Sequence, residues 1–296
     1  RAGVDPGVGQ RRRTGRPGGL MQGASREAHK ALAAHVGDAL GGTGDGAAQR
    51  AASIGDALFT VAGLLWAEPA VRRALIDPGR SPDDRAALAN RLVGGRIEPA
   101  AADLVAAAVR ERWDGPRDLI SAIDEFGIVA HLAAADAHGR LDRVEDELFR
   151  FGQVLHATPD LRAALLDQAA PEQARRDLVR RLLADQSSPE TVSLVEHAVL
   201  TSRDRRLEPA VDRIIELAAQ RRQRRVAVVR VASALSPEHR DRLENALTAQ
   251  AGGPVRLNVV VDPDLVGGVK VEIGDEVVDG TVQSRIAELE RLLAEQ

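Results

Sequence analysis

The stretch that says most about the fold of this chain is Val259-Val260-Val261-Asp262-Pro263-Asp264-Leu265-Val266-Gly267-Gly268-Val269-Lys270-Val271-Glu272-Ile273-Gly274-Asp275-Glu276-Val277-Val278-Asp279-Gly280-Thr281. Its opening valines predict a β-strand. The Gly267-Gly268 pair predicts a turn whose backbone angles suit residues without a Cβ atom. Two short strands are expected around Gly274-Asp275, which fits a tight hairpin turn. Asp279 is well placed to cap a helix that follows.

The residues on either side complete a small α/β domain over 226–296. Residues 226–231 are rich in β-branched side chains and are too short for a typical helix, so they predict a strand. Ser236-Pro237 opens a helix that Gly252-Gly253 closes, and residues 255–261 alternate as a second strand. A last helix from about residue 282 carries an apolar stripe.

The preceding part of the chain, residues 21–225, is expected to be an N-terminal helical domain. Apolar residues recur at helical spacing, and prolines divide the pattern into segments. Ser81-Pro82 and Ser188-Pro189 each offer a serine N-cap followed by proline at the first helical position. The fold class is therefore mainly α, with a small C-terminal α/β domain.

This helical domain contains an internal repeat with an offset of 90 residues. The segment from Leu58 to Asp77 returns as the segment from Leu148 to Asp167, and a run of leucines and valines farther along matches as well. The period is longer than that of solenoid repeats. It indicates duplication of a four-helix unit, with copies at about 53–138 and 143–225.

The composition gives few hints of chemistry. The chain has no cysteine, which excludes disulfides and thiolate metal sites, and its net charge of −4 indicates no general preference for nucleic acid or anionic lipid. No apolar run approaches the roughly 20 residues of a transmembrane helix. Residues 1–20 are rich in arginine and glycine and lack periodicity, so a disordered lead-in, or a start site assigned too early before Met21, is expected.

No catalytic, cofactor-binding or metal-binding residues are predicted. The seven histidines show no metal-ligand spacing, and the glycine-rich segment 41–46 lacks the lysine of a phosphate-binding loop. Four acids, at 142, 145, 146 and 147, are expected to be solvated at a helix start. The basic run 221–225 is expected at a helix end, with a phosphate contact as the alternative.

The C-terminal pattern resembles that of the delta subunit of F-type ATP synthases, the bacterial counterpart of the mitochondrial oligomycin-sensitivity-conferring protein. The residues that carry the resemblance are Asp262, Pro263, Gly267, Gly268, Gly274, Asp275, Asp279 and Gly280. A second block, residues 146–152, looks like the longer actinobacterial variety of this subunit, which fits the internal repeat.

The resemblance implies a non-catalytic stator subunit without a cofactor. Such a subunit links the alpha subunits of the catalytic head to the b subunits of the peripheral stalk, so that rotor torque is coupled to ATP synthesis. It binds no small-molecule substrate and no nucleic acid directly. It lies at the cytoplasmic face of the cell membrane and is held there only through the complex.

The resemblance also implies a groove for an alpha-subunit helix, formed by the first helix and a fifth helix of the bundle. The first helix supplies Leu32, Val36 and Leu40. The fifth helix has one counterpart in each copy: residues 104–109, or Leu194, Val195, Ala198 and Val199 in the favoured second copy. The rival hypothesis is a stand-alone helical adaptor or regulator whose basic edge at 221–225 contacts nucleic acid. An enzyme is the third and weakest option.

Overall fold

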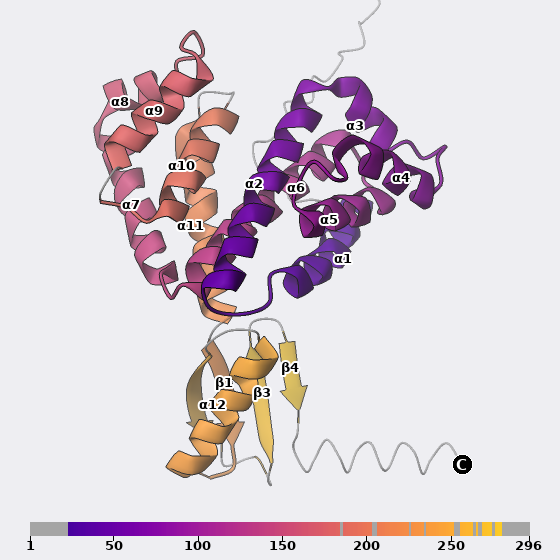
Figure 1. The fold of residues 1–296 in the computed structure, drawn as a ribbon. Coiled ribbons are helices and arrows are strands. Elements are labelled where there is room, and N and C mark those ends of the chain that lie inside the picture. The colour runs from indigo at the N-terminus through magenta and orange to yellow at the C-terminus, as the bar shows by residue number, and fades with distance from the viewer. Residues whose placement is uncertain are drawn as a thin grey trace, which may run out of the picture.

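The computed structural model describes residues 23–279, apart from 184–185, 203–205, 225, 234, 252–254, 263–264, 266–267 and 274–275. The first eleven helices occupy the N-terminal three quarters of the chain (Figure 1). They are α1 (Ala24–Ala39), α2 (Asp45–Ala67), α3 (Pro69–Leu75), α4 (Pro82–Val93), α5 (Pro99–Arg110), α6 (Pro116–Ala137), α7 (Leu141–Ala157), α8 (Pro159–Leu165), α9 (Glu172–Leu183), α10 (Pro189–Thr201) and α11 (Leu207–Arg224).

The helix boundaries follow the prolines, as predicted. Proline opens α3, α4, α5, α6, α8 and α10, where its missing N–H costs nothing because the first amides of a helix have no partner within the helix. Ser81 caps α4 by accepting a hydrogen bond from the Asp84 amide at 3.1 Å. Ser188 precedes α10 at the corresponding point, but its side chain accepts no capping bond. Its amide instead donates to a carboxylate of another helix, described below.

The repeat is visible in the order and lengths of the helices. α3, α4 and α5 begin at residues 69, 82 and 99. α8, α9 and α10 begin at residues 159, 172 and 189, in each case 90 residues later. Each copy therefore contains a seven-residue helix, α3 or α8, in addition to its four longer helices. The prediction of a four-helix unit missed this short helix.

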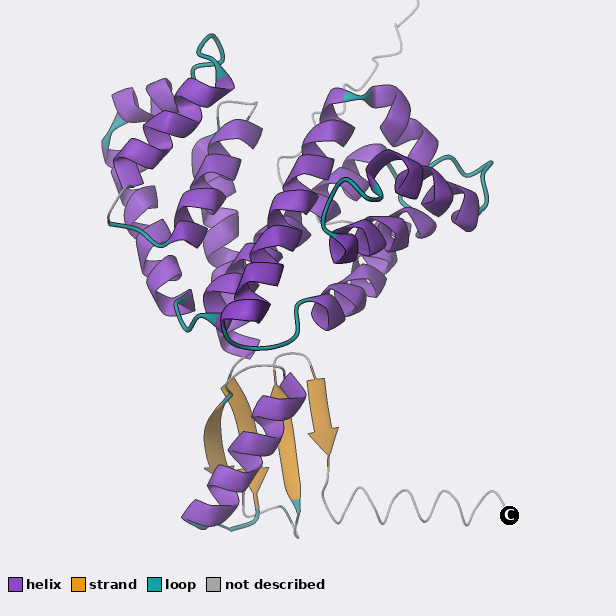
Figure 2. Ribbon diagram, in the orientation of Figure 1, coloured by secondary structure: helices purple, strands orange, loops and turns teal. Residues whose placement is uncertain are grey.

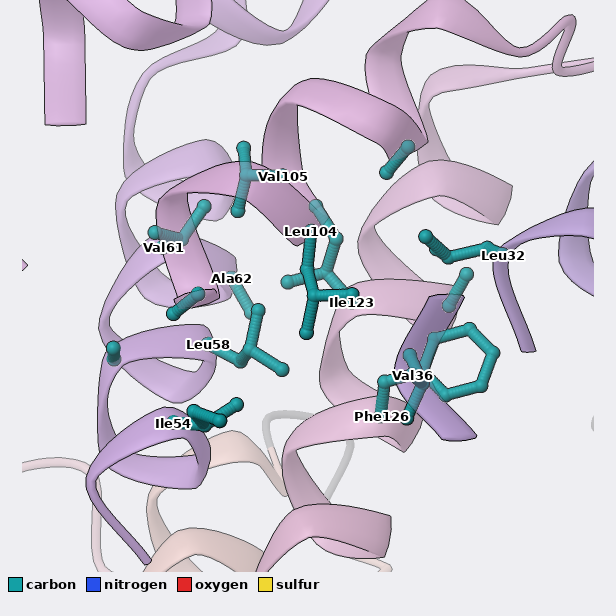
Figure 3. Close-up of a cluster of buried hydrophobic side chains, with 14 of the residues drawn as sticks. Leu32, Val36, Ile54, Leu58, Val61, Ala62, Leu104, Val105, Ile123 and Phe126 are labelled. Atoms are coloured by element: carbon teal, nitrogen blue, oxygen red, sulfur yellow. The ribbon is translucent and has the colours of Figure 1, made fainter. Parts of the chain in front are cut away.

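Two hydrophobic clusters hold the helices together, and α6 belongs to both. The first cluster joins α1 through α6 and includes Leu58, Leu104 and Ile123 (Figure 3). The second begins with Ile128 and Leu132 of α6 and continues through α7–α11. Figure 1 shows the α7–α11 group on one side of α2 and the α3–α5 group on the other. We call the helices of the first cluster, α1–α6, the first lobe, and the helices α7–α11 of the second cluster the second lobe. The two lobes are packed together through α6, which contributes to both clusters.

A small α/β unit follows, with its own hydrophobic cluster. It comprises β1 (Val226–Val231), α12 (Pro237–Ala251), β2 (Arg256–Val261), β3 (Val269–Ile273) and β4 (Glu276–Asp279). The strand order is β2-β1-β3-β4, with β1 parallel to β2 and antiparallel to β3. Figure 2 shows α12 lying across the sheet, and Leu247 of this helix is buried with Val229 and Val271 of the strands. The predicted fold class is confirmed.

The C-terminal signature is partly within the described residues. Gly268 has a φ of 90°, a backbone angle that residues with a Cβ atom rarely adopt. The Asp262 amide donates to the Val231 carbonyl at 2.9 Å, just after β2. β3 and β4 pair as the predicted short strands. Asp279 ends β4, whereas Pro263, Gly267, Gly274, Asp275, Gly280, the expected last helix and the lead-in 1–20 lie outside the described residues.

Candidate partner-binding site

The first predicted set of partner-binding residues lies on one stripe of α1 and on Leu40, which follows the helix, and all three side chains are buried. Leu32, Val36 and Leu40 have exposed fractions of 2%, 3% and 9% and belong to the first cluster. The start of α1 is fixed by Ser25, whose hydroxyl donates to Asp118 at 2.6 Å and accepts from the Asp114 amide at 2.8 Å. The other faces of α1 are open to solvent.

The second predicted set lies on α10 and is also buried. Leu194, Val195, Ala198 and Val199 are all at most 1% exposed and belong to the second cluster. In contrast to α1, α10 has only one exposed residue between Pro189 and Thr201, its first residue Pro189, because α6, α7, α9 and α11 surround it. The residues of this set therefore act as core in the isolated chain.

The structure places the two sets in different clusters. The α1 residues share the first cluster with Leu104, Val105 and Val109 of α5, the first-copy counterpart of the fifth helix. Figure 3 shows Leu32 and Val36 of α1 near Phe126 of α6, which belongs to the same cluster. A shift of 90 residues carries α1 onto 114–129, which is the first part of α6. The structure thus contains two equivalent helix pairs, α1 with α5 and α6 with α10.

Acidic residues of α6 make polar contacts with both lobes. Glu125 binds His29 of α1 at 3.1 Å and Arg213 of α11 at 2.9 Å, while the neighbouring Asp124 binds His197 of α10 at 2.7 Å. Burial raises the pKa of Glu125, but hydrogen bonds from His29 and Arg213 outweigh it and lower the pKa below the ordinary value. These contacts reinforce the packing of the two lobes around α6.

Phe59 of α2 forms an aromatic contact between the lobes. Its ring stacks on His197 with 3.4 Å between centroids and on His131 with 5.1 Å. This geometry depends on two glycines at the crossing of α2 and α6. A Cβ atom on Gly127 would lie 2.5 Å from the Phe59 ring, and one on Gly55 would lie 2.6 Å from His131. Glycine at both positions allows the helix backbones to approach this closely.

Two of the four acids expected to be solvated at the start of α7 are covered instead: the side chain of Glu145 is only 17% exposed and pairs with Arg222, and Glu147 is buried. Glu147 reaches the start of α10, where it accepts hydrogen bonds from the Ser188 amide at 2.8 Å and the Thr191 hydroxyl at 2.6 Å. Arg143 also donates to it, at 2.7 Å. Burial raises the pKa of Glu147, and these hydrogen bonds lower it below its ordinary value. The prediction was wrong for Glu147 because its partners Ser188 and Thr191 lie more than 40 residues away in the sequence.

The arginine run at the end of α11 makes contacts within the chain. Arg221 binds Asp136 of α6 at 3.2 Å, and Arg222 binds Glu145 of α7 at 3.2 Å. Two of the charges on which the nucleic-acid hypothesis depended are therefore paired with acids of neighbouring helices. The run joins α11 to α6 and α7, which supports the structural interpretation.

Over the part of the chain that the structure describes, no three histidine, aspartate or glutamate side chains gather as a metal ion would require. In the same residues, no single helix is long and apolar enough to cross a membrane. Only α2 and α3 together meet the length and composition criterion, and they are bent by 109° at their junction.

The comparisons with known proteins identify the family. The model of the ATP synthase delta (OSCP) subunit matches residues 129–293. A protein described as ATP synthase subunit delta from Streptomyces coelicolor is 42% identical over 274 residues, which cover 93% of this chain and 98% of that protein. The chain belongs to the ATP synthase delta (OSCP) family. The delta subunit of Acidothermus cellulolyticus is 44% identical and that of Thermobifida fusca 39%, and each match covers 93% of this chain and 100% of the relative.

The family match begins inside α6 and contains the second copy and the α/β unit, whereas the relatives also align with the first copy. A delta-family subunit of this length therefore carries both copies. This chain is a non-catalytic stator subunit of the F-type ATP synthase. Among solved structures, a chain in the Toxoplasma gondii mitochondrial ATP synthase hexamer is similar, with a TM-score of 0.26 and 19% identity over 56% of this chain and 94% of that one.

Proposed function

We propose that this subunit bridges the alpha subunits of the catalytic head and the b subunits of the peripheral stalk. A bridge that opposes torque needs a stiff body with separate binding units at its ends. The observation that carries the proposal is the arrangement of cores: both helical lobes share α6, while the sheet has its own cluster. We assign residues 21–225 to the helical domain and 226–296 to the α/β domain on this basis.

The helical domain contacts the alpha subunits in this proposal, with α1 as the principal helix. Leu32, Val36 and Leu40 hold α1 against the first lobe, and its opposite face remains open for an amphipathic helix. The second-copy set at Leu194, Val195, Ala198 and Val199 has less support as a contact surface because these side chains are covered. α5, which packs beside α1, is the better companion helix.

The α/β domain binds the b subunits in the same proposal, and this contact holds the chain at the cytoplasmic face of the membrane. Two exposed valines support a protein contact on this domain: Val260 and Val261 of the edge strand β2 are 42% and 50% exposed. An exposed apolar edge strand is commonly covered by a partner. Membrane association through the complex then requires no membrane-spanning segment in this chain.

A titration with the isolated catalytic head tests the contact of α1. Trp66 and Trp113 both belong to or pack on the first cluster, so their fluorescence reports on the lobe that contains α1. The tryptophans of the head are removed or subtracted. Saturable one-to-one binding is expected, and Ala34→Arg on the open face of α1 should weaken it at least tenfold. Ala87→Arg, at an exposed position of α4, is the matched control and should bind normally. Equal binding of both variants would contradict the α1 contact.

A further inference from the structure

The two copies of the repeat treat an equivalent phenylalanine differently. A shift of 90 residues carries Asp56 and Phe59 of α2 onto Asp146 and Phe149 of α7. In the first copy, Phe59 is half-buried and stacks on His131 and His197, while Asp56 lies 3.2 Å from His131. In the second copy Phe149 is 56% exposed, the largest exposed fraction among the large hydrophobic side chains of the described residues.

The sequence explains why Phe149 does not pack within its own lobe. The close approach of α2 and α6 requires Gly55 and Gly127. Their counterparts at an offset of 90 are Glu145 and Leu217, which are much larger. Glu145 binds Arg222 of α11 across this junction at 3.2 Å, so an ion pair replaces the glycine contact. Phe149 consequently has no slot on α11 equivalent to the one that Phe59 has on α6.

The exposed side of α7 combines this apolar ring with acidic groups. Helical spacing places Asp142, Asp146 and Gln153 on the same side as Phe149, and all four are exposed. Neither aspartate carboxylate has an ion pair among the described contacts. Arg150 flanks this side, and its guanidinium donates to the Asp146 carbonyl oxygen at 3.2 Å. We call Asp142, Asp146, Phe149 and Gln153 the α7 face.

We propose that the α7 face docks an amphipathic helix of another ATP synthase subunit, which places a histidine or arginine plane on Phe149 and its positive charge near Asp146. Within this chain, the equivalent pair Asp56 and Phe59 contacts the imidazole rings of His131 on α6 and His197 on α10. Planar cationic side chains stack favourably on aromatic rings and are attracted to carboxylates. A large aromatic ring beside two unpaired acids is complementary to such a helix. The inference rests on the proposed stator function and adds a partner surface on the second lobe.

Cysteine labelling in the assembled ATP synthase tests the proposal directly, since the chain has no cysteine of its own. Phe149→Cys and Val154→Cys each introduce a single thiol on α7 at an exposed position. Val154 lies on a different side of the helix and is the matched control. Each variant is labelled with a maleimide, once as the free chain and once in the purified complex, and co-purification with the complex is measured on the same sample. A maleimide-benzophenone label then records the neighbouring chain.

We expect the thiol at position 149 to react at least tenfold more slowly in the complex than in the free chain, with a crosslink to a different subunit. The thiol at position 154 should react equally in both. Equal reactivity at 149 in a complex that contains the chain would overturn the docking proposal and leave the stator function intact. A crosslink to a second copy of this chain would overturn the choice of partner. Failure of both variants and of the unmodified chain to co-purify would overturn the stator function and this inference with it.

Discussion

Single glycines decide how closely the helices of the first lobe approach. Gly55 and Gly127 lie where α2 crosses α6, and each faces an aromatic ring of the other helix at a distance that excludes a Cβ atom. Glycine within a helix costs roughly 0.5–1 kcal/mol relative to alanine. At this crossing the close packing of Phe59 and His131 offsets that cost.

Replacement of Gly127 by alanine should therefore destabilise the chain even though alanine favours helices. The added methyl group would lie 2.5 Å from the Phe59 ring, and overpacking of this kind costs about 1–3 kcal/mol. Gly63→Ala is the matched control, because no atom lies within 4 Å of its Cβ position. Urea unfolding of both variants checks the prediction. A Gly127→Ala variant as stable as Gly63→Ala would show that α2 and α6 do not pack this closely.

Gly268 presents a backbone requirement rather than a packing requirement. With φ at 90°, valine in its place would destabilise the α/β unit by roughly 1–3 kcal/mol or more. Asparagine tolerates positive φ better than valine does, so Gly268→Asn should cost less. Hydrogen exchange of the β1 and β3 amides measures the effect within the sheet. Unchanged protection and unchanged stalk binding in the valine variant would argue against the turn.

At the scale of the element, a carboxylate on one helix can bind the polar groups at the start of another helix. Glu147 of α7 accepts hydrogen bonds from the amide of Ser188, the residue just before α10, and from the hydroxyl of Thr191 in its first turn, where Ser188 itself makes no side-chain capping bond. The negative charge also lies near the positive end of α10, where the helix dipole favours it. These hydrogen bonds fix the start of α10 against the side of α7.

Glu147→Gln should lower the free energy of unfolding by about 1–3 kcal/mol at pH 7, because buried hydrogen-bond partners lose a charged acceptor. The pKa of Glu147 is lowered below its ordinary value of 4.5 in the folded chain. Its contribution is therefore fully present above about pH 5 and is lost as the pH falls through the folded pKa. The difference between the two proteins should narrow with falling pH.

Urea titrations at pH 7 and at successively lower pH measure this difference. Asp142→Asn, an exposed acid on the same helix, is the control and should change stability little at any pH. A difference for Glu147→Gln that grew as the pH fell would contradict the assigned role.

The elements were largely predictable from the sequence, and their partners were not. Proline, serine and hydrophobic spacing are local signals, so the helix starts at Pro82 and Pro99 could be predicted. The burial of Glu147 could not, because its partners on α10 are remote in the sequence. The same reason applies to the partner-binding helices: periodicity identified an apolar stripe on α1, but it could not indicate that α5, rather than α10, packs beside it.

At the scale of the whole molecule, the shared helix α6 predicts how the chain unfolds. Both tryptophans report on the first lobe, yet the second lobe packs on the same α6. Leu194→Ala removes a fully buried side chain from the second cluster, at a typical cost of 2–5 kcal/mol. We expect it to shift the tryptophan transition together with the circular dichroism transition.

Leu247→Ala provides the contrast, because Leu247 belongs to the separate cluster of the α/β unit. It should leave the tryptophan transition unchanged and lower only the stability of the sheet, as measured by hydrogen exchange. A tryptophan transition that responds to Leu247→Ala, or ignores Leu194→Ala, would show that the cores are coupled differently.

The junction between α11 and the sheet has a mechanical consequence. α11 ends at Arg224 and β1 begins at Val226, and β1 is an inner strand, hydrogen-bonded to β2 on one side and β3 on the other. A pull transmitted along α11 therefore loads both ladders lengthwise, so that many hydrogen bonds resist sliding at once instead of opening one after another. In the proposed bridge between head and stalk, α11 and β1 would therefore bear tension as one continuous member.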